Sequence, residues 1–364
     1  MAMAASGHVL ALVLSLAALV FMDQAFAGAA PGRLLSLRRG DAHWVQAHAH
    51  GRIFGVPSDA RAVLIVDPAT NTADTAAMPV PHGEALWAGG VLAGNGKVYG
   101  VPFNSPSVLT MDPRANTSST TAMTGLTGAA KWYGGVLAGN GKIYGMPFDS
   151  ASVLIIDPAT NTADNSSIDT GSSEAAKWVG GVLAGDGTIY GIPYCSTSVL
   201  IIDPATNTAD TTTITGLAGK YKWYGGVLAG NGKIYGIPYF SSSVLIIDPA
   251  TNTADTTTMT VSTDAPKWAG GVLAGNGKIY GIPDTTASVL IIDPATDTAD
   301  TTSITGLSGV NKWYGGVLVD SGKIYGIPFN ADSILIIDPT SNTADTTTIT
   351  GLAGRNKWRG GVLA

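Results

Sequence analysis

The hydrophobic and polar positions of this chain repeat about every 45 residues. Residues 225–238 read GGVLAGNGKIYGIP, and the same fourteen letters return at 270–283. Tryptophans mark the same period, at Trp44, Trp87, Trp132, Trp178, Trp223, Trp268, Trp313 and Trp358. The pattern predicts a tandem array of one structural unit rather than several unrelated domains.

Within the unit that begins at Trp223, the pattern predicts four short strands. YGGVLA at 224–229 and KIYGIP at 233–238 flank an Asn-Gly pair, which is a strong hairpin signal. SVLIID at 243–248 is an apolar run too short for a helix, and is typical of a strand covered on both faces. TADTTTMT at 253–260 is rich in threonine and suits an outer edge that meets water.

These units predict an all-β fold, a seven-bladed β-propeller of four-stranded antiparallel blades. One such sheet would not be stable alone, whereas seven stacked around an axis cover every apolar face. An open solenoid is the rival, and the tight hairpins disfavour it. Residues 357–364 form a first strand with nothing after it, so we expect them to complete the first blade and close the ring. The alternative is a piece of a longer, eight-unit protein.

The repeat GGVLAGNGKIYGIP…SVLIIDPATNTADTTTITG resembles the YVTN-type propeller repeat and also the Kelch repeat. The resemblance covers nearly all of residues 43–364. The chain departs from Kelch in the position of its Gly-Gly pair and from YVTN in its tryptophan and its unit length. Both resemblances imply a propeller, and neither implies a particular function, because propellers host binding modules and unrelated enzymes alike.

The N-terminus differs in character from the repeats. Residues 9–22 are an uncharged apolar run, followed by Ala25-Phe26-Ala27. This pattern predicts a signal peptide over 1–27, then a linker over 28–42 and the propeller over 43–364. An uncleaved anchor is the alternative. No other apolar run could span a membrane, so we expect a secreted, extracellular or periplasmic mature protein without a membrane span.

Composition removes several classes of function. The formal net charge is -6 and basic residues are scattered singly in the repeats, which argues against nucleic acid as a partner. No phosphate-binding loop, dinucleotide fingerprint, nucleophile elbow or zinc spacing occurs, so we expect no cofactor, no metal and no catalytic residue. Three weaker signals favour drift or a degenerate strand over chemistry: the lone Cys195, the His43, His48 and His50 group, and the His82-Glu84 pair.

Differences between the copies are more informative than their identity. The strand order places GNG and DPATN on one face of the disc, and the variable loops and blade linkers on the other. Aromatic residues recur on the variable face, either directly after the tryptophan or after the second strand. They are the candidate binding residues: Tyr133, Tyr224, Tyr314, Phe103, Phe148, Tyr194, Tyr239 and Phe329. The repeated tryptophans could stack on sugars, but filling the blade junctions is the favoured interpretation.

From these observations we expect a non-catalytic module that binds glycans or protein surfaces through the variable face. One alternative is a propeller enzyme of the lyase or hydrolase type with a central pocket. Unlike blades would then aim different polar residues at the axis, and the candidates are His82, Glu84, Glu174, Asp264 and Lys220. Another alternative is a structural coat or matrix protein. The oligomeric state is open.

Overall fold

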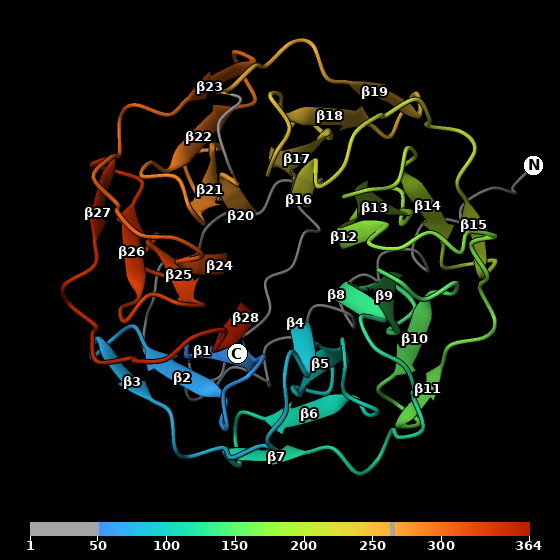
Figure 1. Ribbon diagram of the computed structural model, residues 1–364, viewed down its shortest axis with the longest axis horizontal. Helices are drawn as coiled ribbons and strands as arrows, with labels where there is room; N and C mark the ends of the chain where they lie inside the picture. Colours follow the sequence, from blue (N-terminus) through green and yellow to red (C-terminus); the bar gives the residue numbers. More distant parts are fainter. Residues whose placement is uncertain (1–50, 263–265) are drawn as a thin grey trace, which may run out of the picture. The chain divides into compact units, whose positions relative to one another are not determined.

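The computed structural model describes residues 51–262 and 266–364, which form a ring of seven four-stranded antiparallel sheets (Figure 1). Blade 1 consists of β28, β1, β2 and β3, and blades 2 to 7 take β4 to β27 in consecutive groups of four. The prediction of an all-β, seven-bladed propeller is confirmed. The predicted signal peptide, the linker, Trp44, His43, His48 and His50 lie outside the described residues.

Each blade has four strands, which follow one another from the axis of the ring to its rim. The innermost are β4 (Trp87–Leu92), β8 (Trp132–Leu137), β12 (Trp178–Leu183), β16 (Trp223–Leu228), β20 (Trp268–Leu273), β24 (Trp313–Leu318) and β28 (Trp358–Leu363). The second are β1 (Ile53–Pro57), β5 (Val98–Pro102), β9 (Ile143–Pro147), β13 (Ile189–Pro193), β17 (Ile234–Pro238), β21 (Ile279–Pro283) and β25 (Ile324–Pro328).

The outer half of each blade is shorter. The third strands are β2 (Leu64–Asp67), β6 (Leu109–Asp112), β10 (Leu154–Asp157), β14 (Leu200–Asp203), β18 (Leu245–Asp248), β22 (Leu290–Asp293) and β26 (Leu335–Asp338). The outermost are β3 (Thr72–Asp74), β7 (Thr117–Ser119), β11 (Thr162–Asp164), β15 (Thr208–Asp210), β19 (Thr253–Asp255), β23 (Thr298–Asp300) and β27 (Thr343–Asp345). Short edges of this kind resist pairing with other chains.

The two ends of the described chain meet in blade 1, where β28 lies beside β1 (Figure 1). The pairing sets Ile53 opposite Leu363, Gly55 opposite Gly361, and Pro57 opposite Trp358. The prediction that the C-terminal strand closes the ring is therefore confirmed.

Each tryptophan at the start of an inner strand fills the junction between two blades. Trp132 of blade 3 packs with Tyr99 and Val101 of blade 2 as well as with Leu154 of its own blade. Its indole Nε1 donates to the main-chain oxygen of Ser152 at 2.7 Å. The other tryptophans of the described residues repeat this bond. The junction-filling prediction is confirmed, because a buried indole with its donor satisfied is part of the core.

A lysine precedes every described tryptophan except Trp87, which follows Leu86, and four of these lysines hold neighbouring blades together. Lys131 Nζ donates to the main-chain oxygens of Phe103, Ser105 and Gly128 at 3.0, 2.9 and 2.8 Å. Lys222, Lys312 and Lys357 make three such bonds each. Burial lowers the pKa of these four lysines to about 8, while three carbonyl acceptors around each ammonium favour its charged form.

No helix with the length and apolar character of a membrane span occurs in the part of the chain that the structure describes.

Candidate active site on the propeller axis

The inner strand of each blade begins with a bulge that turns one side chain toward the axis. In β8 the pairing with β9 shifts between Trp132 and Gly135. Within this bulge Gly134 has a φ of 75°, a left-handed conformation that glycine adopts without strain. Tyr133, directly before it, lies 5.4 Å between ring centroids from Tyr224, which belongs to blade 5. Blade 4 stands between these two blades in the ring, so the rings of Tyr133 and Tyr224 can meet only if both side chains point toward the axis.

The bulge glycines form a closed collar around the axis. A Cβ atom on Gly89 would lie 2.9 Å from the Cα of Gly134, and one on Gly134 would lie 3.1 Å from the Cα of Gly180. The series continues from blade to blade and returns from Gly360 to Gly89 at 3.4 Å. The Gly-Gly pair of the repeat is thus required for close approach of the inner strands. The Gly-Gly pair also places the residue that precedes it, such as Tyr133 before Gly134, at one end of the central channel of the ring.

Two positions from each blade meet above this collar. One is the residue between the tryptophan and the bulge glycine, and the other follows the proline that ends the second strand. The first set is Ala88, Tyr133, Val179, Tyr224, Ala269, Tyr314 and Arg359. The second set is Ser58, Phe103, Phe148, Tyr194, Tyr239, Asp284 and Phe329. The repeat therefore provides fourteen equivalent positions near the axis, and the residues at these positions differ between blades although the scaffold does not.

All eight candidate binding residues from the sequence lie together in what we call the axial aromatic cluster: Tyr133, Tyr224, Tyr314, Phe103, Phe148, Tyr194, Tyr239 and Phe329. Their rings form a continuous set of contacts, for example 5.7 Å between Phe103 and Tyr133 and 5.5 Å between Tyr224 and Tyr314. Tyr314 stacks on Phe329 at 4.3 Å and 12°. Each such pair contributes about 0.5–1.5 kcal/mol beyond simple burial.

A cavity of about 160 Å³ opens within this cluster. Its lining is Phe103, Tyr133, Phe148, Val179, Tyr194, Tyr224, Tyr239, Tyr314 and Arg359. It is a compact, apolar site on the axis with one cation in its wall, which is the usual composition of a small-molecule site.

Arg359 supplies that cation from β28, the strand that closes the ring. Its Cζ lies 5.0 Å from the ring centroid of Phe329, 5.5 Å from Phe103 and 5.9 Å from Tyr133. Within the described residues, its Nε is buried without a hydrogen-bond partner. A guanidinium held among three rings with an unused donor is prepared to bind an anionic or carbonyl oxygen.

Asp284 is the one carboxylate among the fourteen axial residues. It follows β21 in blade 6, and its side chain is fully buried. Burial raises the pKa of Asp284 to about 6, and a hydrogen bond from Tyr239 and the charge of Lys312 act in the other direction. Among the described residues, its Oδ1 has no hydrogen-bond partner. A carboxyl group that titrates near neutral pH beside a cavity is suited to proton transfer.

Four tyrosines of the cluster, Tyr133, Tyr194, Tyr239 and Tyr314, are neutral hydrogen-bond donors. Burial raises the pKa of Tyr133 to about 12 and also raises the pKa values of Tyr194, Tyr239 and Tyr314. The hydroxyls of Tyr133 and Tyr224 are hydrogen-bonded to each other. Tyr239 interacts with both Asp284 and Tyr314, so it connects the buried carboxyl group with the cavity. Asp284 itself does not line the cavity.

The polar residues suggested by the sequence for a catalytic centre do not gather here. His82, Glu84, Glu174 and Lys220 are exposed on blade linkers, and none of them lines the cavity. Asp264 lies outside the described residues. Cys195 is half-buried in the loop after Tyr194. Within 51–262 and 266–364, no three His, Cys, Asp or Glu side chains are grouped as a metal site requires.

Arg359 and Asp284 were missed as site residues. The sequence did show that each stands at an axial position where other blades carry an aromatic or small residue. This difference from the other blades was the signal in the sequence, and it is stronger evidence for a site than the His82-Glu84 pair in a linker.

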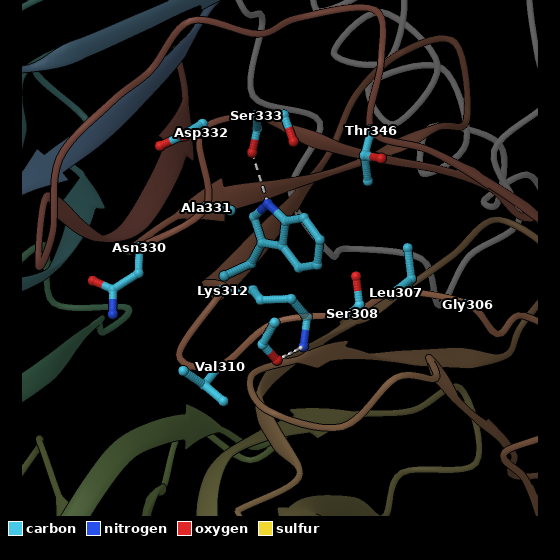
Figure 2. Close-up of a pocket in the computed structure, with 12 residues that line it drawn as sticks. Gly306, Leu307, Ser308, Val310, Lys312, Asn330, Ala331, Asp332, Ser333 and Thr346 are labelled. Atoms are coloured by element: carbon cyan, nitrogen blue, oxygen red, sulfur yellow. Dashed lines mark hydrogen bonds between the residues drawn. The ribbon is translucent and has the colours of Figure 1, made fainter.

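Larger cavities lie at two blade junctions away from the axis. One of about 290 Å³ is lined by Trp313, Lys312 and Ser333 among others, and Figure 2 shows its walls. Trp313 donates to the main-chain oxygen of Ser333, and Lys312 donates to that of Gly309. An equivalent cavity of about 320 Å³ lies at Trp223. The ammonium groups of Lys312 and Lys222 each donate three hydrogen bonds to main-chain oxygens. Neither lysine therefore has a free donor for a ligand, unlike Arg359 in the axial cavity, whose Nε has no partner among the described residues.

These features define a class of protein, a seven-bladed propeller whose equivalent axial positions carry unlike residues. No protein-family model and no curated protein sequence matches the chain. Solved structures do match. The Pseudomonas aeruginosa periplasmic gluconolactonase is 12% identical over 86% of this chain and 98% of its own, with a TM-score of 0.63.

Two further structures are of virginiamycin B lyase from Staphylococcus aureus. One is 11% identical over 71% of this chain and 83% of its own, with a TM-score of 0.59. The other, a catalytically inactive variant with quinupristin, is 10% identical over 73% and 84%, with a TM-score of 0.60. At these identities the similarity establishes the shared fold.

The expected function must be corrected. The similar propellers are named as a lactonase and a lyase. The axial cavity of this chain has a cation and phenols in its wall, and the titratable carboxyl group of Asp284 lies behind Tyr239, one of the lining residues. Our main expectation, a non-catalytic module for glycans or protein surfaces, was wrong because it treated the aromatic face as a flat contact surface. The enzyme alternative is better supported.

Proposed function

We propose that the protein is a propeller hydrolase that cleaves an ester or lactone bond in the axial cavity. The observation that carries the proposal is Asp284, a fully buried carboxyl group with a pKa raised to about 6, one tyrosine away from a cavity that contains Arg359. Keeping a carboxylate in an apolar site, with one of its oxygens unpaired among the described residues, costs stability. Such a cost is characteristic of residues retained for chemistry.

Arg359 and one phenol of the Tyr133–Tyr224 pair would bind the carbonyl oxygen, because the bond between these two hydroxyls uses only one of their protons. Donors that are already in place stabilise the negative charge that develops there when a nucleophile attacks. The phenols stay protonated because burial raises their pKa values. They therefore donate throughout the physiological pH range.

Asp284 would act as the base, through Tyr239. Water attacks the carbonyl carbon and passes its proton to the Tyr239 oxygen, while the Tyr239 proton moves to the Asp284 carboxylate. The C–O bond to the leaving alkoxide then breaks, and the same path returns the proton to that alkoxide. A concerted transfer is required because burial raises the pKa of Tyr239 and disfavours a free tyrosinate.

We further propose an exported enzyme, secreted or periplasmic, with repeats of the YVTN or Kelch-like type. The apolar run and small-residue site before Gly28 support export. The periplasmic setting named for the similar gluconolactonase is compatible with it.

The experiment is a hydrolysis assay of the full chain against esters and lactones of aromatic and aliphatic acids. We expect turnover of at least one class, reduced about 10²- to 10⁴-fold by Asp284→Asn. Asp332→Asn, on an exposed loop of blade 7, is the matched control and should leave the rate unchanged. No turnover of any class, or equal rates for the two variants, would refute the proposal.

A further inference from the structure

We infer that the axial cavity binds a single planar aromatic group bearing a carboxylate or ester carbonyl, which makes esters and lactones of small aromatic acids the substrate class. The binding part of this inference rests on the cavity alone. The assignment of substrates rests on the proposed hydrolase function.

The size of the cavity limits the ligand. A volume of about 160 Å³ is close to that of cavities of about 150 Å³ that bind benzene. The ligand is therefore about one six-membered ring with a small substituent. A larger group would have to extend out of the cavity mouth.

The walls select an aromatic group. Seven of the nine lining residues are Phe or Tyr, and Val179 is the one aliphatic residue among them. Neighbouring rings meet edge-on, at 79° for Phe103 and Tyr133 and 80° for Tyr133 and Tyr224. Walls built this way offer both faces and edges, and a planar ring can pack against them in the favoured offset or T-shaped geometry.

The polar groups of the wall select one oxygen-bearing substituent. Arg359 is held by Phe103, Tyr133 and Phe329, and its buried Nε has no partner within the described part of the chain. A carboxylate or carbonyl oxygen would satisfy that donor and gain a charge-assisted bond.

The same walls disfavour polyols. The hydroxyls of Tyr133 and Tyr224 already bond each other, and Tyr239 interacts with Tyr314 and Asp284. A sugar acid would lose water from several hydroxyls and find few partners, at an unfavourable cost for each. The chain should thus differ in substrate from its structural neighbour that is named as a gluconolactonase.

The test is a calorimetric titration of the full chain with benzoate, benzyl alcohol, acetate and gluconate. We expect benzoate to bind at least tenfold more tightly than acetate or gluconate. Arg359→Gln should weaken benzoate at least tenfold and leave benzyl alcohol unchanged, which also shows that the cavity of the variant is intact. Arg355→Gln, at an exposed position of the preceding linker, should change neither.

Asp284→Asn separates this inference from the proposed function. The variant should bind benzoate as well as the parent chain or better, because a nearby negative charge is removed. Gluconate binding equal to benzoate, or benzoate binding unaffected by Arg359→Gln, would overturn the inference even if aliphatic esters are hydrolysed. Benzoate binding without hydrolysis of any ester would sustain the inference and overturn the hydrolase proposal.

Discussion

The ammonium group of Lys312 donates to the main-chain oxygen of Asp284 at 2.8 Å, and no ion pair joins its nitrogen to the Asp284 carboxylate among the described residues. Its other bonds go to the oxygens of Thr286 and Gly309. The lysine is thus committed to the scaffold, as Lys131 is in blade 3. The Asp284 carboxylate accepts hydrogen bonds from Tyr239 and Thr285, and its Oδ1 has no partner among the described residues.

Asp284→Asn should stabilise the protein while it removes activity. The pKa of Asp284 in the folded chain is about 6, above the ordinary value of 3.8. The folded state therefore binds the proton more tightly than the unfolded state. The stability gained from this proton is fully present below about pH 4 and is lost as the pH rises through 6. At pH 8 the ionised group costs at most about 3 kcal/mol, since one pKa unit is about 1.4 kcal/mol.

Urea denaturation of both chains at pH 4 and pH 8 measures this effect. The variant should be more stable at pH 8 by a margin that shrinks at pH 4. A variant that is less stable at pH 8 would show that the carboxylate is a structural group with partners of its own.

Lys312→Met should weaken the junction between blades 6 and 7. The substitution keeps much of the apolar stem but leaves three main-chain oxygens without their charged donor. Bonds to charged groups contribute about 1.5–3 kcal/mol each and are not additive, so we expect a loss of about 3 kcal/mol in unfolding free energy. Lys220→Met, at an exposed linker position, should change stability by less than about 0.5 kcal/mol. Equal effects of the two substitutions would show that the bonds of Lys312 do not hold blades 6 and 7 together.

Gly134→Ala should destabilise the collar. Gly134 has a φ of 75°, and an added Cβ would lie 3.1 Å from the Cα of Gly180. Strain and the clash together predict a loss of about 2–4 kcal/mol. Gly139→Ala is the control, because that exposed turn residue has nothing within 4 Å of an added Cβ. Thermal melts of the two variants provide the comparison, and a Gly134 variant that melts with the control would argue against the collar.

The repeat made the fold predictable. Strand order, turns and the junction tryptophans follow from the repeat, and ring closure follows from its incomplete first and last units. The fourth strand is shorter than predicted, because residues 253–260 form a strand only over Thr253–Asp255. The convergence of aromatic residues from Phe103 to Phe329 was also accessible, because their two positions per unit must lie at one mouth of the ring. The Gly-Gly pair was recognised only as a marker, since the bulge and the contact between Gly134 and Gly180 depend on the neighbouring blade.

The chemistry of the site was not predictable in the same way. Asp284 looked like one of many aspartates in the sequence, and most of the others cap exposed turns, as Asp300 does through Thr302 and Ser303. Its burial, and the pKa that follows from it, arise from side chains of three blades. Arg359 likewise becomes recognisable as a site residue only in the closed ring, where it lies beside Phe103 and Phe329.

The most direct test of the hydrolase account is the pH dependence of kcat/KM for an ester that the full chain cleaves. A base with a pKa of about 6 predicts a rate that rises about tenfold per pH unit below 6 and levels off above it. The residual rate of Asp284→Asn should lack this inflection. A parent profile that is flat between pH 4 and 8, or an inflection that survives in Asp284→Asn, would contradict the role given to Asp284.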